Sequence, residues 1–296
     1  MNYTLFFIVF LFILIKNNHK EKWRNLQSDN YFSFFNQNDF RFRDCNSIDD
    51  CKQNYSNSEI KLTPFEKRKI KEVCDGLIKK IPQYNFIFQD LSIIKVNNDI
   101  ENSMPHTRGK YIILSSRFID KFLEDDNLII KRLLAHEQFH IYQRYNPKKI
   151  DKFYTQFWNM EKLKKPLPKE ILDLNRTNPD ALPDINWLFK RKNDYILPLC
   201  LYKKDATSLI DTENILIRMD KNHNFIDLVD DLENRKLLIN EPDFRKFFGD
   251  EMSNNYHANE LSASLFEIIV EDAIFNRKEE RPEAYHKMKE FLDSEN

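Results

Sequence analysis

Two histidines and a glutamate in one short stretch have the residue types and the spacing of a metal-dependent hydrolase site. Residues 133–140 read Leu-Leu-Ala-His-Glu-Gln-Phe-His, which contains the motif HExxH. In a helix, side chains four residues apart lie on one face, so His136 and His140 can both bind one Zn²⁺. Glu137 projects about 100° around the same helix, where its carboxylate can act as a general base without being a ligand. The motif therefore predicts zinc as the cofactor and a hydrolytic reaction.

The motif must lie on a helix, and the flanking residues supply the signals that begin and end one. Asp125 or Asp126 can cap the N-terminus, and the helix is expected to continue to Tyr145, before Pro147. The apolar residues around the motif can bury the rest of the helix surface and hold it rigidly in the fold.

The other elements follow from local patterns. Thr63, Pro64 and Glu66 form a capping box with proline at the first helical position, which predicts a helix to about Ile81. Strands are expected at Ser92–Val96, Tyr111–Leu114, Trp187–Phe189, Tyr195–Tyr202 and Ile215–Met219. Further helices are expected at Ser116–Leu123, Asn259–Arg277 and Pro282–Leu292, and more weakly at Phe225–Leu238. Residues 147–184 contain five prolines and are expected to be irregular. These elements together predict an α+β fold.

Composition excludes several classes of function. The three glycines, Gly76, Gly109 and Gly249, are too scattered for a phosphate-binding loop, a dinucleotide-binding loop or a nucleophile elbow. The 46 basic and 47 acidic residues leave a net charge of −1, so no nucleic-acid partner is expected.

The N-terminus carries a hydrophobic segment, Tyr3 to Ile15, of thirteen uncharged residues. As a helix it would rise ~20 Å, less than the ~30 Å hydrocarbon core of a membrane. The favoured interpretation is that residues 1–16 form a single-pass membrane anchor, so that the membrane itself is a partner. The basic residues that follow it would keep the rest of the chain on the cytoplasmic side. The alternatives are a cleaved signal, which would make the protein secreted, and a buried core helix.

Residues 17–58 are rich in Asn, Ser, Asp and Phe without a sustained period, which predicts a tether or a pro-segment. Cys45 and Cys51 within it are close enough for a small disulfide loop, although free buried thiols fit equally well. The globular domain is then expected to span residues 59–296.

The motif, preceded by the strand at Tyr111–Leu114 and the helix at Ser116–Leu123, resembles the N-terminal subdomain of zincin metallopeptidases. The resemblance implies a zincin-like domain in which a small mixed sheet and the active-site helix are followed by a mainly helical C-terminal part. It also implies hydrolysis of peptide bonds in a peptide or protein substrate. In zincins an edge strand above the motif helix pairs with extended substrate, which would put Tyr111 at the upper rim of the cleft. The alternative is that this strand is internal.

The third metal ligand distinguishes the subclasses of zincins. Residues 141–145 lack the Gly and the third His of metzincins. Residues 256–264 read Tyr-His-Ala-Asn-Glu-Leu-Ser-Ala-Ser, which resembles the gluzincin segment Asn-Glu-x-x-Ser-Asp at Asn259 and Glu260. The resemblance implies that Glu260 is the third ligand. Ser264 replaces the Asp that orients a ligand histidine in that family. The candidates for this role further along the helix are Glu267, Glu271 and Asp272.

Zincins often use a Tyr or His to stabilise the oxyanion of the tetrahedral intermediate, and Tyr256 and His257 are the nearest candidates. The main prediction is therefore a membrane-tethered zinc metallopeptidase with Glu137 as its general base. The alternative is a catalytically inactive zincin-like domain that binds a peptide or a partner.

Overall fold

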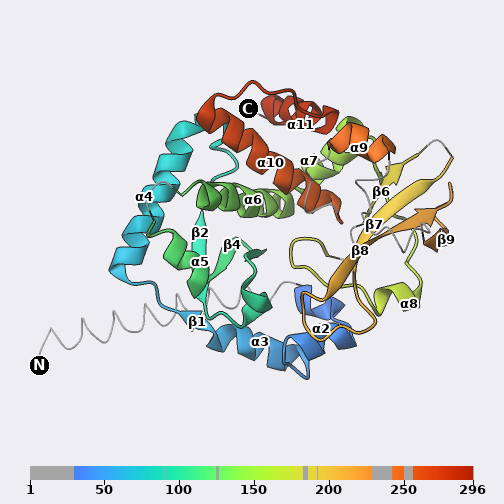
Figure 1. The fold of residues 1–296 in the computed structure, drawn as a ribbon, viewed down its shortest axis with the longest axis horizontal. Coiled ribbons are helices and arrows are strands. Elements are labelled where there is room, and N and C mark those ends of the chain that lie inside the picture. The colour runs from blue at the N-terminus through green and yellow to red at the C-terminus, as the bar shows by residue number, and fades with distance from the viewer. Residues whose placement is uncertain are drawn as a thin grey trace, which may run out of the picture.

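A mixed four-stranded sheet lies against the helix that carries the motif (Figure 1). The structure is a computed structural model that describes residues 30–89, 91–124, 127–182, 186–191, 193–228, 242–249 and 256–295. The strands of this sheet are β1 (Glu59–Ile60), β2 (Ser92–Val96), β3 (His106–Arg108) and β4 (Tyr111–Ser115). Their order is β1-β2-β4-β3, with β2 and β4 parallel and the other pairs antiparallel. The two edge strands of the sheet are therefore β1 and β3.

The motif helix is α6 (Leu128–Tyr145), and residues 134–143, which include the motif, are all buried. The Asn127 side chain caps the helix by accepting hydrogen bonds from the backbone N–H groups of Ile129 and Ile130. The predicted caps, Asp125 and Asp126, lie outside the described residues. The sheet lies on one side of α6, and α10 (Ala258–Phe275) crosses it on another (Figure 1). Phe139 of α6 stacks on Phe266 of α10 with the ring centroids 5.0 Å apart. This packing fixes the two helices against each other.

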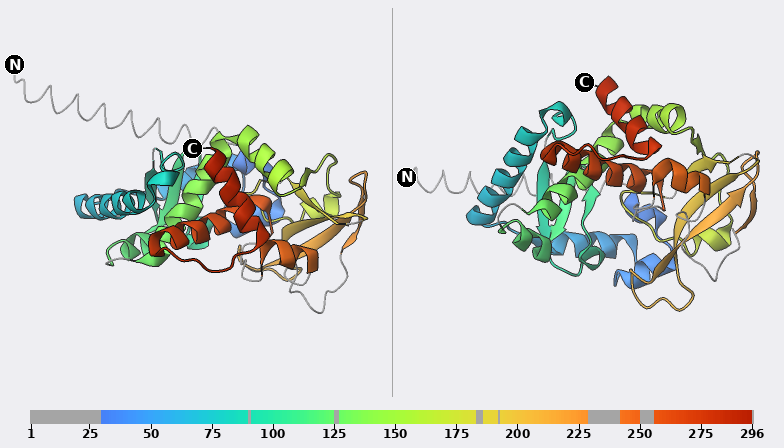
Figure 2. Two further views of the ribbon diagram at one scale, coloured as in Figure 1. Left: turned by 90° about the horizontal axis from the view of Figure 1, so that it is seen from above. Right: turned by 45° about the horizontal axis from the view of Figure 1, so that its top comes forward.

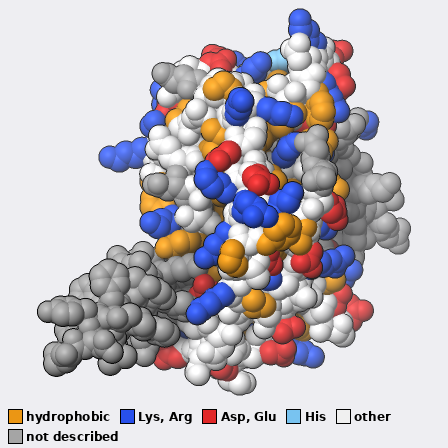
Figure 3. All heavy atoms as spheres, turned by 90° about the vertical axis from the view of Figure 1, so that its left-hand side faces the viewer, with side chains coloured by type: hydrophobic (Ala, Val, Ile, Leu, Met, Phe, Trp, Pro, Cys, Tyr) orange, Lys and Arg blue, Asp and Glu red, His pale blue; other side chains and the backbone are white. Residues whose placement is uncertain are grey.

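The helix α4 (Pro64–Lys80) begins and ends where the sequence predicts. The Thr63 hydroxyl accepts from the Glu66 N–H, and the Glu66 carboxylate accepts from the Thr63 N–H at 2.7 Å. The face of the molecule on which α4 lies carries basic and acidic side chains interspersed (Figure 3), including the exposed pair Lys71–Asp75.

Residues 31–57, within the segment expected to be a tether or a pro-segment, contain regular structure. They form η1 (Tyr31–Phe34), α2 (Gln37–Phe42) and α3 (Ile48–Asn57), which pack against the first sheet. Cys45 and Cys51 are joined by a disulfide with their Cα atoms 5.1 Å apart. The sequence signal for these helices is weak because each helix is short. They are held in place by residues distant in sequence; for example, Arg43 donates a hydrogen bond to the carboxylate of Glu101.

A second sheet of five antiparallel strands corrects the expectation of a mainly helical C-terminal part. It lies at the other end of the molecule from α4 (Figure 2). Its strands are β5 (Glu161–Lys162), β6 (Trp187–Lys190), β7 (Tyr195–Tyr202), β8 (Thr212–Met219) and β9 (Phe225–Leu228). The predicted helix at 225–238 is thus a strand over its first four residues, because this stretch pairs with β8; residues 229–238 lie outside the described part.

The remaining elements are short connections and two C-terminal helices. They are η2 (Pro82–Tyr84), η3 (Ile100–Ser103), α5 (Ser116–Lys121), α7 (Pro147–Lys152), η4 (Phe153–Phe157), α8 (Lys169–Leu172), α9 (Pro242–Phe248) and α11 (Glu283–Ser294). The mixture of helices with a mixed and an antiparallel sheet confirms the α+β class.

The expected single-pass membrane anchor needs correction. Within the described residues, the structure has no helix that is both long and apolar enough to cross a membrane. The hydrophobic segment 3–15 itself lies outside them.

Candidate metal centre

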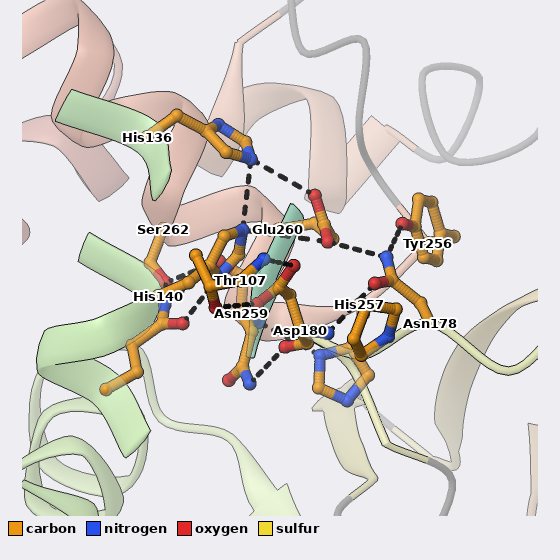
Figure 4. Close-up of polar contacts among 12 residues, drawn as sticks. Thr107, His136, His140, Asn178, Asp180, Tyr256, His257, Asn259, Glu260 and Ser262 are labelled. Atoms are coloured by element: carbon orange, nitrogen blue, oxygen red, sulfur yellow. Dashed lines mark hydrogen bonds and ion pairs between the residues drawn. The ribbon is translucent and has the colours of Figure 1, made fainter. Parts of the chain in front are cut away.

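Two imidazoles from α6 and one carboxylate from α10 converge at a buried point (Figure 4). The Nε2 atoms of His136 and His140 are 3.0 Å apart, and Glu260 oxygens lie 3.4 Å and 3.7 Å from them, respectively. Ligand atoms ~2.0–2.2 Å from one tetrahedral ion are about 3.3–3.6 Å from one another. The three groups can therefore reach a single metal ion without a change of backbone. These are the three residues that the motif and the gluzincin resemblance predicted as metal ligands.

Small residues let α10 approach α6 closely enough to bring Glu260 to this point. Ala263 and Ser262 are fully buried one turn or less after Glu260. His257 begins the helix, with its Nδ1 accepting a hydrogen bond from the Asn259 N–H at 3.1 Å. His257 is thus the N-cap of α10, rather than the oxyanion contact that its position in the sequence suggested.

The outer nitrogens of both imidazoles are held by side chains that turn the inner nitrogens toward the site. His136 Nδ1 is 2.6 Å from Glu267 Oε1, and His140 Nδ1 is 2.8 Å from Gln143 Oε1. Such partners fix the orientation of a metal-binding histidine. Of the three acids considered for this role, Glu267 fills it. The other two pair with arginines that follow the end of α10, Glu271 with Arg277 and Asp272 with Arg281.

Gln143 and Asn178 are functional candidates that sequence reasoning missed. Gln143 also donates to Ser262 Oγ at 2.8 Å, which ties the His140 partner to α10. Asn178 donates from Nδ2 to Glu260 Oε1 at 2.8 Å and so holds the third carboxylate. Asn178 lies in the irregular, proline-containing segment 175–181, where no periodicity distinguishes one polar residue from another.

Tyr256, a predicted oxyanion contact, lies beside Glu260 and has a suitable orientation for that role. Its Oη accepts from Arg176 Nη2 at 3.3 Å and from Asn178 Nδ2. Burial raises the pKa of Tyr256 well above its usual range, and the nearby Glu260 carboxylate raises it further. The phenol therefore keeps its proton, and because both contacts use the oxygen as acceptor, that proton can be donated to a ligand.

Glu137 is buried beside the three converging groups, with 3% of its surface exposed. Its Oε2 has no hydrogen-bond partner within the described part of the chain. Burial raises the pKa of Glu137 well above its usual range; His136 lowers it, while Asp180 and Glu260 raise it. A divalent cation held next to this carboxyl would lower its pKa, since the cation favours the charged form. Glu137 is thus placed beside the three converging groups with one oxygen available to accept a proton.

The electrostatics of the three converging groups favour a cation. Burial opposes the charged form of His136, but hydrogen bonds to Glu260 and Glu267 outweigh it and raise the His136 pKa well above its usual range. Burial lowers the pKa of His140. Burial raises the pKa of Glu260, but His140 and His136 outweigh it and bring that pKa to about 2. Glu260 is therefore ionised at neutral pH, and its negative charge beside two imidazole nitrogens favours a bound cation.

Two cavities meet at this group. One, of about 330 Å³, is lined by His136, Glu137, Glu260 and Tyr256 and is at the lower end of the ~300–1,000 Å³ usual for ligand sites. The other, of about 270 Å³, is lined by His140 and Gln143. Pro179 and Asp180 line both cavities and so form the wall between them.

The edge strand beside the cavities is β3, which corrects the expectation that Tyr111 forms the rim. Tyr111 lies on β4, which is internal, and it lines neither cavity. The outward-facing backbone N–H of Thr107 in β3 donates to Asp180 Oδ2 at 2.9 Å. Arg144 donates to the Thr107 hydroxyl at 2.9 Å and to Asp180 Oδ1 at 3.0 Å. The Thr107 N–H, with which an extended ligand could pair, is thus already hydrogen-bonded to Asp180.

We expect Glu267→Gln to weaken metal binding by about 10–100-fold, the usual cost of removing a partner that orients a ligand histidine. The reason is that Gln keeps the shape but not the charge that holds His136 Nδ1. Titration of the chelator-treated protein with zinc measures the change. The matched control is Glu271→Gln on the same helix, which contacts Arg132 and Arg277 instead. Equal zinc affinity in both variants and the parent would contradict the role of Glu267.

Comparison of the chain with protein-family models, with curated proteins and with solved structures found no match. The functional assignment therefore rests on the geometry and chemistry of this site.

Proposed function

We propose that the chain is a zinc-dependent peptide-bond hydrolase of the zincin type, with Glu260 as a gluzincin-like third ligand. The observation that carries the proposal is the convergence of His136, His140 and Glu260 within 4.8 Å of one another in a buried site. A donor set of two imidazoles and one carboxylate suits zinc, and three protein ligands leave one position open, as in catalytic zinc sites. The mixed sheet with an antiparallel edge strand beside the motif helix also supports a zincin-like subdomain.

The residues around the site can perform the steps of peptide hydrolysis. When bound, zinc would polarise the scissile carbonyl and make a water molecule more acidic. Glu137, with one oxygen unpartnered among the described residues, would take the proton from the attacking water and deliver it to the leaving amine. Tyr256 would donate its hydroxyl proton to the developing oxyanion. Asn178 orients both Tyr256 and Glu260, which couples the oxyanion donor to the metal site.

Metal analysis of the purified full chain, combined with hydrolysis of a mixed peptide library, tests the proposal. We expect one zinc per chain, loss of hydrolysis after treatment with a chelator, and recovery when zinc is added back. Hydrolysis that persists without metal would contradict the mechanism. Zinc binding without cleavage of any peptide would instead support the catalytically inactive, peptide-binding alternative.

A further inference from the structure

Arg176, whose guanidinium group has no acidic partner among the described residues, lines the larger of these two cavities. Arg176 donates from Nη2 to Tyr256 Oη at 3.3 Å and approaches Met104 Sδ from Nη1 at 3.8 Å. Its Nε is buried and has no hydrogen-bond partner among the described residues. Its backbone is fixed, because the Arg176 N–H donates to the Cys200 carbonyl of β7 at 2.9 Å. The charge of Arg176 is thus held in place at the cavity wall.

The other arginines near the metal group have carboxylate partners, which distinguishes them from Arg176. Arg43 pairs with Asp39 at 2.7 Å and with Glu101 at 2.9 Å. Arg144 pairs with Asp180 at 3.0 Å. Arg176 makes no ion pair within the part of the chain that the structure describes. A largely desolvated charge without a counterion is costly, and a planar guanidinium is suited to bind a carboxylate with two hydrogen bonds.

Five acidic side chains line the cavity, and none of them forms an ion pair with Arg176 in the described part of the chain; apart from Glu137, each is held by other groups. Glu101 accepts from Arg43 and from two tyrosine hydroxyls. Asp180 is held by Thr107 and Arg144, as described above. Glu260 and Glu267 face the imidazole of His136. A ligand that carries its own anionic group would complete the pairing of Arg176.

Three polar contacts connect Arg176 with the metal group. Arg176 contacts Tyr256, Tyr256 contacts Asn178, and Asn178 contacts Glu260 (Figure 4 shows the last two). The path is on the order of two extended residues, at ~3.3–3.6 Å each. A carboxylate bound at Arg176 could therefore belong to the residue next to a peptide bond that lies at the metal group.

We propose that Arg176 binds the terminal carboxylate of a peptide, so that the site acts on the C-terminal end of its substrate. This inference rests on the proposed hydrolase function. A terminal carboxylate fits better than an acidic side chain in mid-chain, because Asp180 occupies the pairing groups of Thr107 on the edge strand. Pro179 and Asp180 also separate the two cavities that a long extended chain would have to cross.

Calorimetric titration of the full-length, chelator-treated protein tests the inference with three probes of one size. They are N-acetyl-alanyl-phenylalanine, its C-terminal amide, and N-acetyl-alanyl-glutamate with an amidated C-terminus. We expect the first to bind roughly 10–100-fold more tightly than the second, since hydrogen bonds to charged groups have effects of that size. Equal affinity of the first two probes would overturn the inference. Tightest binding of the third would show recognition of an acidic side chain and overturn the terminal assignment.

Variants separate recognition from a structural role of Arg176. Arg176→Gln should abolish the preference for the free acid, and Arg176→Lys should keep part of it because the charge remains. The control for net charge is Arg68→Gln on the exposed face of α4, which should leave the preference unchanged. A variant of Arg176 that weakens the acid and the amide equally would point to support of Tyr256 alone and would contradict carboxylate binding. Because no metal is present, failure of zinc binding or of hydrolysis would not change this readout.

Discussion

Replacement of Glu137 by Gln is expected to lower the rate of peptide hydrolysis by roughly 10²–10⁴-fold while zinc content stays at the parent level. Gln has nearly the same shape but cannot take up the proton of the attacking water. Glu137 is not one of the three converging groups, so its replacement leaves the donor set intact. Because Glu137 Oε2 has no partner in the described part of the chain, loss of its charge removes no hydrogen bond at that oxygen.

Initial rates on a peptide that the parent cleaves, measured with metal content on the same samples, check this expectation. Glu72→Gln is the matched control, because it makes the same chemical change on the exposed face of α4. A Glu137→Gln protein that is as active as the parent would exclude Glu137 as the general base. Loss of zinc together with activity would assign Glu137 a part in holding the metal instead.

The sequence predicts those parts of the site that depend on local geometry. His136 and His140 share a face of α6 because they are four residues apart, and no tertiary information is needed to see this. Glu260 lies 120 positions after His140 (260 − 140), so it could be found only through a resemblance to a known segment. Its arrival depends on the packing of α10 against α6, which small residues such as Ala263 permit.

The residues that sequence reasoning missed act through contacts between distant parts of the chain. Asn178 reaches Glu260 across 82 positions, and Asp180 reaches Thr107 across 73. Both lie in the irregular segment 175–181, whose conformation is set by its surroundings and not by a helical or strand period. Gln143 lies three residues after His140 on α6, but its contact with His140 Nδ1 depends on the orientation of the imidazole ring, which the sequence does not reveal.

The fold shows the same division between local and tertiary signals. The capping box at Thr63 fixes the start of α4 from four residues, and the structure agrees. The edge strand β3 is only three residues long, His-Thr-Arg, and its buried polar side chains do not resemble a strand in the sequence. It is a strand because it pairs with β4, and its residue His106 lines the larger of the two cavities, whereas Tyr111 lines neither.

Removal of the Glu260 carboxylate is expected to weaken zinc binding by roughly a hundredfold. Zinc sites with four protein ligands bind with ~10–16 kcal/mol, so one ligand contributes about 3 kcal/mol, or ~10²-fold in affinity. Glu260→Ala, His136→Ala and His140→Ala should show similar losses in competition titrations with a chromophoric chelator. The alternative is that Glu260 serves only the N-terminus of α10, since it lies in the first turn. Glu283 also lies in the first turn of a helix, α11, and is exposed, so Glu283→Ala reports the effect of helix polarity alone. If Glu260→Ala lowers thermal stability as Glu283→Ala does but leaves zinc affinity unchanged, Glu260 is not a ligand.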